Sequence, residues 1–497
     1  MTRTAAELGE GLAPVRAARA IRPGERIHIL GIAGAGASAA ALHAHAAGAA
    51  VSGCDPGGPS PYTPALEAAG IPIAWGHDAA HVAVDPAPDR LAVTKALTAI
   101  DPHNAELVAA ATQGIPIEGW QQLVADAATG RTLVAVAGTH GKSTTAGWLT
   151  WVLAEAGLDP SAFVGALLPA VLTGDLPATA RVGQGSPFVV EADEYAGNFD
   201  PYRPDVALVT TVEWDHPDVF ANRAAVLQAF AAWLGQVPEA TLVANVADRG
   251  VRDLLALLGK RQGHIVRVAV GNADDAPDMD LRAEISAWSN AGTVIELSGS
   301  GVASRSIQLR TSGGHNVVNA LVVAAAAQAL GADPEHIASG LSTFPGIGRR
   351  MERKGEAGGV VVYDDYGHHP TAVRATIAAM RQREPGRRLW AVYEPLTFHR
   401  TAAMLDAFAA ALAEADAVAV ADIWASRDPD TTITSPEALA AAVLERRPEI
   451  EAAAPGSVEQ TAGWLAAHVR PGDAVLVMGG GRSYRIAELL LENLERS

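Results

Sequence analysis

The feature that most constrains the fold is a glycine-rich loop between a predicted strand and a predicted helix. The apolar run Thr132–Ala137 is followed by Gly138-Thr139-His140-Gly141-Lys142-Ser143, and a helical segment runs from about Thr144 to Ala156. A loop of this kind points backbone amides at a phosphate, while the lysine reaches the outer phosphates and the serine hydroxyl reaches Mg²⁺. The pattern is a shortened form, because Val136 stands where the full motif has glycine. It predicts a nucleotide site on a parallel sheet, and the alternative is a chance turn with a surface lysine.

A second strand-to-loop junction lies near the start of the chain. The strand Ile27–Leu30 runs into Gly31-Ile32-Ala33-Gly34-Ala35-Gly36, followed by a predicted helix over Ser38–Ala47 and a strand over Ala50–Ser52 that leads to Asp55. The spacing Gly-x-x-Gly-x-Gly differs from the dinucleotide pattern Gly-x-Gly-x-x-Gly. The three glycines can place a diphosphate on the helix N-terminus, with the aspartate near a ribose. The alternative is a glycine-packed turn without a ligand.

A third block of alternating strands and helices completes the chain. It opens with the strand Gly359–Tyr363 and a predicted acidic turn, Asp364-Asp365-Tyr366, and the turn-rich segment 343–348 precedes it. With 497 residues, the chain has the length of about three domains. We predict an α/β protein with a Rossmann-like N-terminal domain (1–128), a central P-loop ATP-binding parallel-sheet domain (129–345) and a Rossmann-like C-terminal domain (346–497).

Charge and composition narrow the classes of partner. Lys plus Arg total 37 and Asp plus Glu total 55, which gives a net charge of −18 and argues against nucleic-acid binding. Cys54 is the only cysteine, so no intrachain disulfide can form. The uncharged stretch Ile27–Cys54 is broken by glycines, and Val317–Ala332 is short for a membrane span, so both are interpreted as buried elements. We expect no membrane insertion and a cytoplasmic protein.

Two acidic segments follow predicted buried strands of the central block. They are Glu191-Ala192-Asp193-Glu194 and Glu213-Trp214-Asp215-His216. Functional loops gather at the carboxyl ends of parallel strands, and carboxylates there suit Mg²⁺. His216 is a candidate metal ligand, proton carrier or helix cap. Each segment, taken alone, is also compatible with a solvated loop.

Three smaller motifs carry open alternatives. Gly314-His315-Asn316 lies at a predicted helix start, where asparagine also serves as a cap. The segment Asp364–Pro370 contains two acids with His368 and His369, for which a zinc site is one interpretation, although a lone histidine pair with one cysteine elsewhere in the chain is poor evidence for it. The pairs Arg349-Arg350 and His399-Arg400 are either anion-binding or solvated surface.

In this order, the motifs resemble those of the Mur ligase family along nearly the whole chain. The resemblance rests on residues 31–36, 138–143, 191–195, 215–216, 314–316, 348–350 and 364–370. It implies a three-domain enzyme of peptidoglycan synthesis that uses ATP to join a UDP-sugar carboxylate, UDP-N-acetylmuramate, to the amino acid L-alanine through an acyl phosphate. It also implies a monomer or a weak homodimer.

The resemblance assigns roles to individual residues. The loop 138–144 would hold the triphosphate. The UDP-sugar would be bound by the first glycine loop, through Gly31, Gly34, Gly36 and Asp55. Lys142 would be a catalytic phosphate ligand, and Mg²⁺ would be organised by Ser143, Glu191 and His216. Asn316 would contact the adenine, Arg349 would contact the phosphate region, and Asp364 would contact the nucleotide or lie at the closing hinge. His368 would lie near the amino acid.

One departure concerns the acceptor side. The family carries Pro-His-Arg where this chain has Pro395-Leu396-Thr397, so we predict that Arg400 binds the amino-acid carboxylate instead. The alternatives are a related amide ligase with a different amino acid, peptide or acceptor, such as one serving muropeptide recycling, and a non-catalytic nucleotide-binding homologue. A dinucleotide oxidoreductase would rest on the first glycine loop alone.

Overall fold

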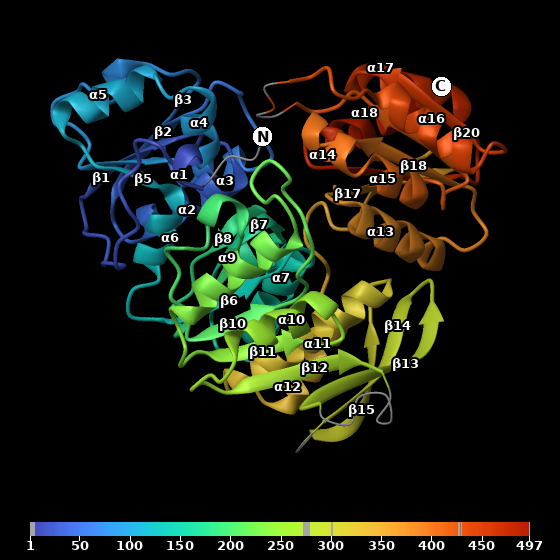
Figure 1. The fold of residues 1–497 in the computed structure, drawn as a ribbon, viewed down its shortest axis with the longest axis horizontal. Coiled ribbons are helices and arrows are strands. Elements are labelled where there is room, and N and C mark those ends of the chain that lie inside the picture. The colour runs from blue at the N-terminus through green and yellow to red at the C-terminus, as the bar shows by residue number, and fades with distance from the viewer. Residues whose placement is uncertain (1–4, 272–278, 300–301, 426–427, 429, 497) are drawn as a thin grey trace.

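Three separate sheets divide the chain, in the order that the three strand-to-loop junctions predict. A computed structural model describes residues 5–271, 279–299, 302–425, 428 and 430–496, and its three lobes run from blue through green and yellow to red in Figure 1. Each sheet lies within one of the three predicted sequence ranges. The boundaries at 128 and 345 themselves stay predictions.

The N-terminal sheet is parallel throughout, with strand order β3-β2-β1-β4-β5. Its apolar strands carry the core because helices cover both faces of a parallel sheet. The strands are β1 (Arg26–Leu30), β2 (Ala50–Cys54), β3 (Ile73–Ala74), β4 (Arg90–Val93) and β5 (Ile117–Gly119). The helices are α1 (Ala5–Leu8), α2 (Ala35–Ala46), α3 (Thr63–Ala68), η1 (Ala79–His81), α4 (Lys95–Ile100), α5 (Ala105–Gln113) and α6 (Trp120–Ala127).

The central sheet has ten strands in the order β15-β14-β13-β12-β11-β10-β6-β9-β7-β8. Its core from β13 to β7 is parallel, and the strands at both ends add antiparallel pairs that the sequence interpretation missed. The strands are β6 (Thr132–Ala137), β7 (Ser161–Leu168), β8 (Ala178–Arg181), β9 (Pro187–Ala192), β10 (Val206–Val209), β11 (Thr241–Asn245), β12 (Ile265–Val270), β13 (Leu281–Ser289), β14 (Gly292–Gly299) and β15 (Val302–Leu309). The helices are α7 (Lys142–Glu155), α8 (Ala170–Thr173), η2 (Tyr195–Gly197), α9 (Arg223–Gly235), α10 (Arg249–Leu258), α11 (Gly314–Ala329) and α12 (Pro334–Thr343).

The C-terminal sheet has the order β16-β17-β21-β18-β19-β20, with β16 antiparallel to an otherwise parallel sheet. The strands are β16 (Glu352–Ala357), β17 (Val360–Asp365), β18 (Leu389–Glu394), β19 (Ala417–Ala421), β20 (Glu451–Gly456) and β21 (Ala474–Gly479). The helices are α13 (Pro370–Arg383), α14 (Phe398–Ala403), α15 (Leu405–Leu412), α16 (Pro436–Arg446), α17 (Val458–His468) and α18 (Ser483–Arg496).

Two local predictions are wrong in detail. The helix after the first glycine loop begins at Ala35 rather than Ser38, so Gly36 lies in the first turn of α2 instead of the loop. Asp364 and Asp365 are the last two residues of β17, not a turn. Both carboxylates are therefore presented by a rigid strand end, which is where ligand sites of open α/β sheets lie.

Within the described ranges, no helix combines the length and the apolar composition that crossing a membrane requires.

Candidate active site

A cavity of about 850 Å³ lies where the three domains meet. The N-terminal domain contributes Gly36 and Trp120, and the central domain contributes the loop that contains Lys142. The C-terminal domain contributes the segment before α13 and the side chain of Arg400. The cavity thus joins predicted nucleotide, metal and acceptor residues that are far apart in the sequence.

The phosphate-type loop owes its shape to two glycines with positive φ. Gly138 has φ 136° and a Cβ there would lie 2.2 Å from the Thr210 hydroxyl, while Gly141 has φ 80° and a Cβ would lie 2.5 Å from Asn319. No side chain caps the first turn of α7, whose N-cap is Gly141. The positive end of a 14-residue helix therefore faces the cavity without a side-chain hydrogen bond at its cap.

Lys142 lies inside a cluster of carboxylates. Its Nζ donates to the Gly138 carbonyl at 2.7 Å and to Glu194 Oε2 at 3.0 Å, and Asp193 Oδ1 is 3.5 Å away. Burial by itself lowers the pKa of Lys142, but Glu194, Asp193 and Glu191 outweigh it and raise that pKa above its ordinary value. The lysine is a cation at every physiological pH and is held by groups that a phosphate can replace.

Ser143 connects the loop to two other elements. Its hydroxyl donates to Glu191 Oε1 at 2.9 Å, and Arg350 Nη2 donates to the same hydroxyl oxygen at 2.7 Å. Glu191 also accepts from the Gly165 amide at 2.6 Å. The predicted metal ligands Ser143 and Glu191 are thus in direct contact, and the C-terminal domain reaches them through Arg350.

His216, the third predicted metal ligand, belongs to a different group. Asp193, Glu194 and His216 place one ligand atom each within 4.8 Å of one another. Burial, assisted by the neighbouring Asp193 carboxylate, raises the pKa of Glu194 to about 7, although Lys142 acts in the opposite direction. Two oxygens and one imidazole nitrogen are a donor set that a divalent cation fits.

Arg400 is buried and bonded to the central domain. Its Nε and Nη2 lie 2.9 and 2.8 Å from Asp215 Oδ1, and Nη2 lies 3.2 Å from His216 Nδ1. Burial opposes ionisation of Asp215, yet the guanidinium holds the pKa of that carboxyl well below its usual range. To bind a substrate carboxylate as well, Arg400 would have to share its guanidinium with Asp215. Thr397 caps α14 by accepting from the Arg400 amide, and Leu396 lines the cavity.

His368 faces the same cavity as a neutral ring. Burial, assisted by Arg400, holds the pKa of His368 well below its ordinary value. Its Nδ1 lies 2.9 Å from the Tyr366 carbonyl, which makes Nδ1 the donor and leaves Nε2 free of that proton. Neighbouring His369 is 3.2 Å from the Trp214 carbonyl and caps α13. The two histidines make separate contacts and do not form a shared zinc site.

Arg349 and Asp364 lie apart from the large cavity and line a smaller one of about 80 Å³. Arg349 Nε is 3.1 Å from Asp364 Oδ2, and its Nη2 is 2.8 Å from both the Gly479 carbonyl and the Ser483 hydroxyl. Burial raises the pKa of Asp364 to about 6. These contacts lie within the C-terminal domain, where they tie β17 to β21.

The first glycine loop is closed by Asp55. Its carboxylate accepts from the amides of Ala33 and Gly57 at 3.1 and 2.8 Å. Gly31 has φ 75°, and Gly34 is the N-cap of α2. A Cβ at Gly36 would lie 2.2 Å from the Trp120 ring. Packing explains Gly36, and of these four predicted residues it alone lines the large cavity.

The asparagines of α11 support the loop from behind. Asn316 Nδ2 donates to the Ser312 carbonyl at 2.8 Å, and Asn319 Nδ2 donates to Asn316 Oδ1 at 3.1 Å. Both line the cavity. The side chain of Asn316 lies within α11 rather than at its cap, because the N-cap is Gly313.

Sequence reasoning missed Arg350 as the arginine that reaches the loop. Arg349 has φ 57°, a left-handed conformation that sends the two successive arginines to different neighbours. Nothing in the sequence signals this turn. The Asp193–Glu194 pair was within reach, because it directly follows Glu191 at the end of a predicted strand.

Comparison with known proteins shows which protein family the chain belongs to. Residues 26–132, 136–327 and 349–481 match, in order, the patterns described as Mur ligase family, catalytic domain; Mur ligase middle domain; and Mur ligase, glutamate ligase domain. The chain belongs to the Mur ligase family.

Individual relatives narrow the comparison. The chain is 36% identical over 475 residues to the UDP-N-acetylmuramate–L-alanine ligase of Gloeobacter violaceus, covering 95% of this chain and 96% of the relative. It is 40% identical over 463 residues to the enzyme of that name from Kineococcus radiotolerans, covering 92% and 93%. The crystal structure of the UDP-N-acetylmuramate-alanine ligase of Thermotoga maritima superposes with a TM-score of 0.78 at 24% identity, covering 95% and 99%, and supports the fold.

Proposed function

We propose that this protein is an ATP-dependent ligase that joins L-alanine to the carboxyl group of UDP-N-acetylmuramate. The observation that carries the proposal is the near-full-length similarity to enzymes of that name at 36–40% identity. The cavity at the junction of the three domains supports it, because the reaction requires a nucleotide, a sugar carboxylate and an amine to meet at one place.

The central domain would bind the triphosphate. The uncapped N-terminus of α7 supplies donors and Lys142 supplies a cation, whereas the loop amides of Thr139 and His140 already donate to Thr211. In the structure Glu194 and Asp193 hold the lysine, so a phosphate would compete with carboxylates for it. A cation that meets charge developing on the transferred phosphoryl group lowers the barrier.

Mg²⁺ would find two sets of ligands beside the loop. One is the Ser143–Glu191 pair, and the other is the group of Asp193, Glu194 and His216. Bound there, the ion would neutralise phosphate charge while the sugar carboxylate attacks the γ-phosphate. Attack gives an acyl phosphate and ADP; attack of the amine on the acyl carbon then expels inorganic phosphate.

The C-terminal domain would supply the acceptor side. Neutral His368 has the protonation state of a general base, and Nε2 is the nitrogen able to take a proton from the incoming ammonium group. Arg400 is the predicted partner of the amino-acid carboxylate, and the Asp215 contact fixes its position. Asn316 would meet the adenine, Arg349 the phosphate region, and Asp364 the nucleotide or the closing hinge.

The test is phosphate release from ATP by the full chain with UDP-N-acetylmuramate and a panel of amine substrates. The panel contains L-alanine, glycine, L-serine, D-alanine and a tripeptide that begins with L-alanine. We expect the highest kcat/KM with L-alanine and no release when the sugar is omitted. Preference for the tripeptide would replace the proposal by a muropeptide-recycling ligase, and ATP binding without turnover on any substrate would indicate a non-catalytic homologue.

A further inference from the structure

Four metal-ligand side chains gather inside the N-terminal domain, away from the active-site cavity. They are His28 on β1, Cys54 at the end of β2, His81 at the end of η1 and Glu106 in the first turn of α5. One ligand atom from each lies within 4.8 Å of the others. None of the four lines the cavity at the domain junction.

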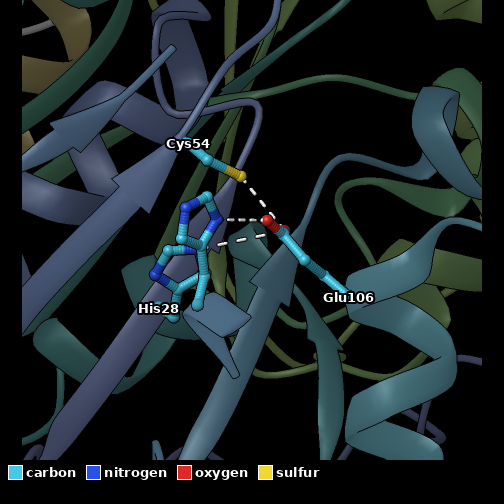
Figure 2. A group of neighbouring side chains, drawn as sticks. His28, Cys54 and Glu106 are labelled. Atoms are coloured by element: carbon cyan, nitrogen blue, oxygen red, sulfur yellow. Dashed lines mark hydrogen bonds and ion pairs between the residues drawn. The ribbon is translucent and has the colours of Figure 1, made fainter. Parts of the chain in front are cut away.

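Glu106 is the centre of the group. Its Oε2 is 3.1 Å from Cys54 Sγ and 3.9 Å from His28 Nε2, and its Oε1 is 2.5 Å from His81 Nδ1. Figure 2 shows the Cys54 sulfur and the His28 ring directed at the Glu106 carboxylate from two strands. Tetrahedral zinc with bonds of about 2.0–2.3 Å places its ligand atoms about 3.3–3.8 Å apart. The observed separations bracket that range, so small side-chain rotations would accommodate the ion.

His28 supplies an independent sign of a missing partner. Its side chain is 4% exposed, and its Nε2 is a buried nitrogen without a hydrogen-bond partner among the described residues. The other ring nitrogen, Nδ1, is 2.9 Å from the Ser52 hydroxyl. With Nδ1 donating to that hydroxyl, the Nε2 lone pair faces a carboxylate with no proton between them. A cation between Nε2 and Glu106 satisfies both groups.

Burial makes the unpartnered nitrogen costly and keeps the His28 ring in the neutral form that binds a metal. Burial lowers the pKa of His28 to about 4, so its ring is neutral and can coordinate. Burial together with Glu106 raises the pKa of the Cys54 thiol above its ordinary range. The nearby cations that lower thiol pKa values in reactive cysteines are replaced here by a carboxylate, which argues against a nucleophilic cysteine.

We propose that His28, Cys54, His81 and Glu106 form a structural zinc site. Two imidazole nitrogens, one sulfur and one carboxylate oxygen suit Zn²⁺, whereas Mg²⁺ prefers oxygen ligands alone. All four tetrahedral positions are filled by protein atoms, as in structural rather than catalytic sites. His81 is 26% exposed in its side chain and gives the ion a route from solvent.

Binding would rearrange two protons. Zn²⁺ would displace the Cys54 thiol proton to solvent, forming a thiolate–zinc bond. His81 Nδ1 now contacts Glu106, and its proton would move to Nε2 so that Nδ1 can coordinate. His77, whose Nδ1 is 3.3 Å from Cys54 Sγ, would then donate to the thiolate. About one proton leaves the protein per ion at neutral pH.

The site would add a metal link between parts of the domain that already share an apolar core cluster. It connects β1 and β2 to η1 and to the start of α5, which cover one face of the sheet. A ligand that binds only the folded state raises the apparent stability by mass action. Zinc removal should therefore lower the melting temperature without any substrate present.

The experiment measures binding to the metal-free full chain with Zn²⁺ and with Co²⁺ as a spectroscopic probe. We expect one tight equivalent of Zn²⁺, release of about one proton and a thiolate-to-cobalt charge-transfer band in the near ultraviolet. Cys54→Ser should abolish that band, and His81→Ala should weaken the tight equivalent at least about tenfold. His45→Ala, an exposed histidine of α2 in the same domain, is the matched control and should bind as the wild type does.

Two outcomes would overturn the proposal. The first is no tight equivalent in the wild-type chain, which would leave the four side chains as a hydrogen-bonded network around Glu106. The second is tight binding that survives Cys54→Ser and His81→Ala but is lost in Asp193→Asn, which would assign the ion to the active-site carboxylates. Circular dichroism of each variant verifies that it is folded, and Cys54→Ser is nearly isosteric.

Discussion

Lys142 and Arg400 are two cations that line one cavity, and their partners differ. Lys142 is shared among Gly138, Glu194 and Asp193, and the longest of these contacts is 3.5 Å. Arg400 makes two short contacts with a single oxygen of Asp215 and is 2% exposed. Under the proposed function the first cation would exchange its carboxylate partners for a phosphate, while the second holds Asp215 and His216 in place.

The carboxylates that contact these two cations, Glu194 and Asp215, differ in the same way. Glu194 has a pKa raised to about 7 by burial, so it can take up a proton when its cation leaves. Asp215 has a pKa well below its usual range despite burial, so losing Arg400 leaves a charge that is hard to neutralise. The chemistry of the nucleotide side is therefore separable from the stability of the fold, and that of the acceptor side is not.

The largest expected effect is the loss of turnover in Lys142→Ala. Removing a cation that stabilises transition-state charge should reduce kcat for phosphate release at least about 100-fold, because such a group contributes about 3 kcal/mol or more. The free energy of unfolding should change by less than about 1.4 kcal/mol, the cost of shifting one carboxyl pKa by a unit. Lys260, an exposed lysine two residues after the end of α10, provides the control, and Lys260→Ala should keep full activity. A Lys142→Ala enzyme with a tenth of the wild-type kcat would contradict the assignment.

The next effect is on stability, in Arg400→Ala. Breaking a buried ion pair by removing one partner costs about 3–5 kcal/mol, so denaturant unfolding should show a clear loss that Lys142→Ala lacks. If Arg400 also binds the substrate carboxylate, the KM for L-alanine rises strongly and the KM for ATP changes little. Arg400→Lys should restore stability in part, because it keeps the charge without the planar fork. An unchanged unfolding midpoint would show that the Asp215 contact carries no stability.

The third prediction compares Glu194, a candidate metal ligand, with Glu394, which has a similarly raised pKa but lies outside the metal-ligand group. The quantity compared is the pH dependence of the Mg²⁺ concentration that activity requires. The ordinary glutamate pKa of 4.5 is raised to about 7 in folded Glu194, so between these values the unfolded chain has lost a proton that the folded chain retains. Stability from this group therefore falls as pH rises from 4.5 to 7, and Mg²⁺ must displace the proton below about 7.

The Mg²⁺ concentration for half-maximal activity should rise as pH falls through 7, and this trend should flatten in Glu194→Gln. Glu394, whose pKa burial also raises to about 7, lies at the end of β18 and is outside the metal-ligand group. Glu394→Gln should keep the wild-type trend. A flattened trend in both variants would mean that the titration does not report the metal site.

The smallest effect is expected for the individual metal ligands. Glu191→Gln and His216→Ala should each raise the Mg²⁺ requirement several-fold, because an amide is a weak ligand for a hard cation and alanine is none. Glu191→Gln should disturb the ligand set that contains Ser143 more than His216→Ala does, because Glu191 accepts a hydrogen bond from the Ser143 hydroxyl. Unchanged Mg²⁺ titrations in both variants would remove these residues from the metal site.

Local patterns in the sequence predicted the nucleotide side well. The strand before the loop was predicted as Thr132–Ala137, and β6 has those bounds, because an apolar run ended by glycine is specified by neighbouring residues. The α/β class, the parallel core of the sheets and the family are likewise confirmed. The antiparallel strands β8, β14, β15 and β16 were missed, since their pairing is set by packing rather than by a local pattern.

Contacts between domains lay beyond sequence reasoning. Arg350 rather than Arg349 reaches Ser143 because a left-handed residue turns the chain between them. Arg400 meets Asp215 across 185 positions of sequence, and no local pattern encodes that meeting. The predicted roles of Asn316, Arg349 and Asp364 stay predictions, and the contacts of the last two tie β17 to β21 within the C-terminal domain.

The most direct measurement is Mg²⁺–ATP binding by titration calorimetry to Lys142→Ala and Arg400→Ala at a temperature where both are folded. The account predicts that Lys142→Ala weakens ATP binding at least about tenfold, which is a loss of about 1.4 kcal/mol, while Arg400→Ala stays within about threefold of the wild type. Equal affinities in the two variants, or a larger loss in Arg400→Ala, would contradict the division of the cavity into an exchangeable phosphate cation and a fixed acceptor-side cation.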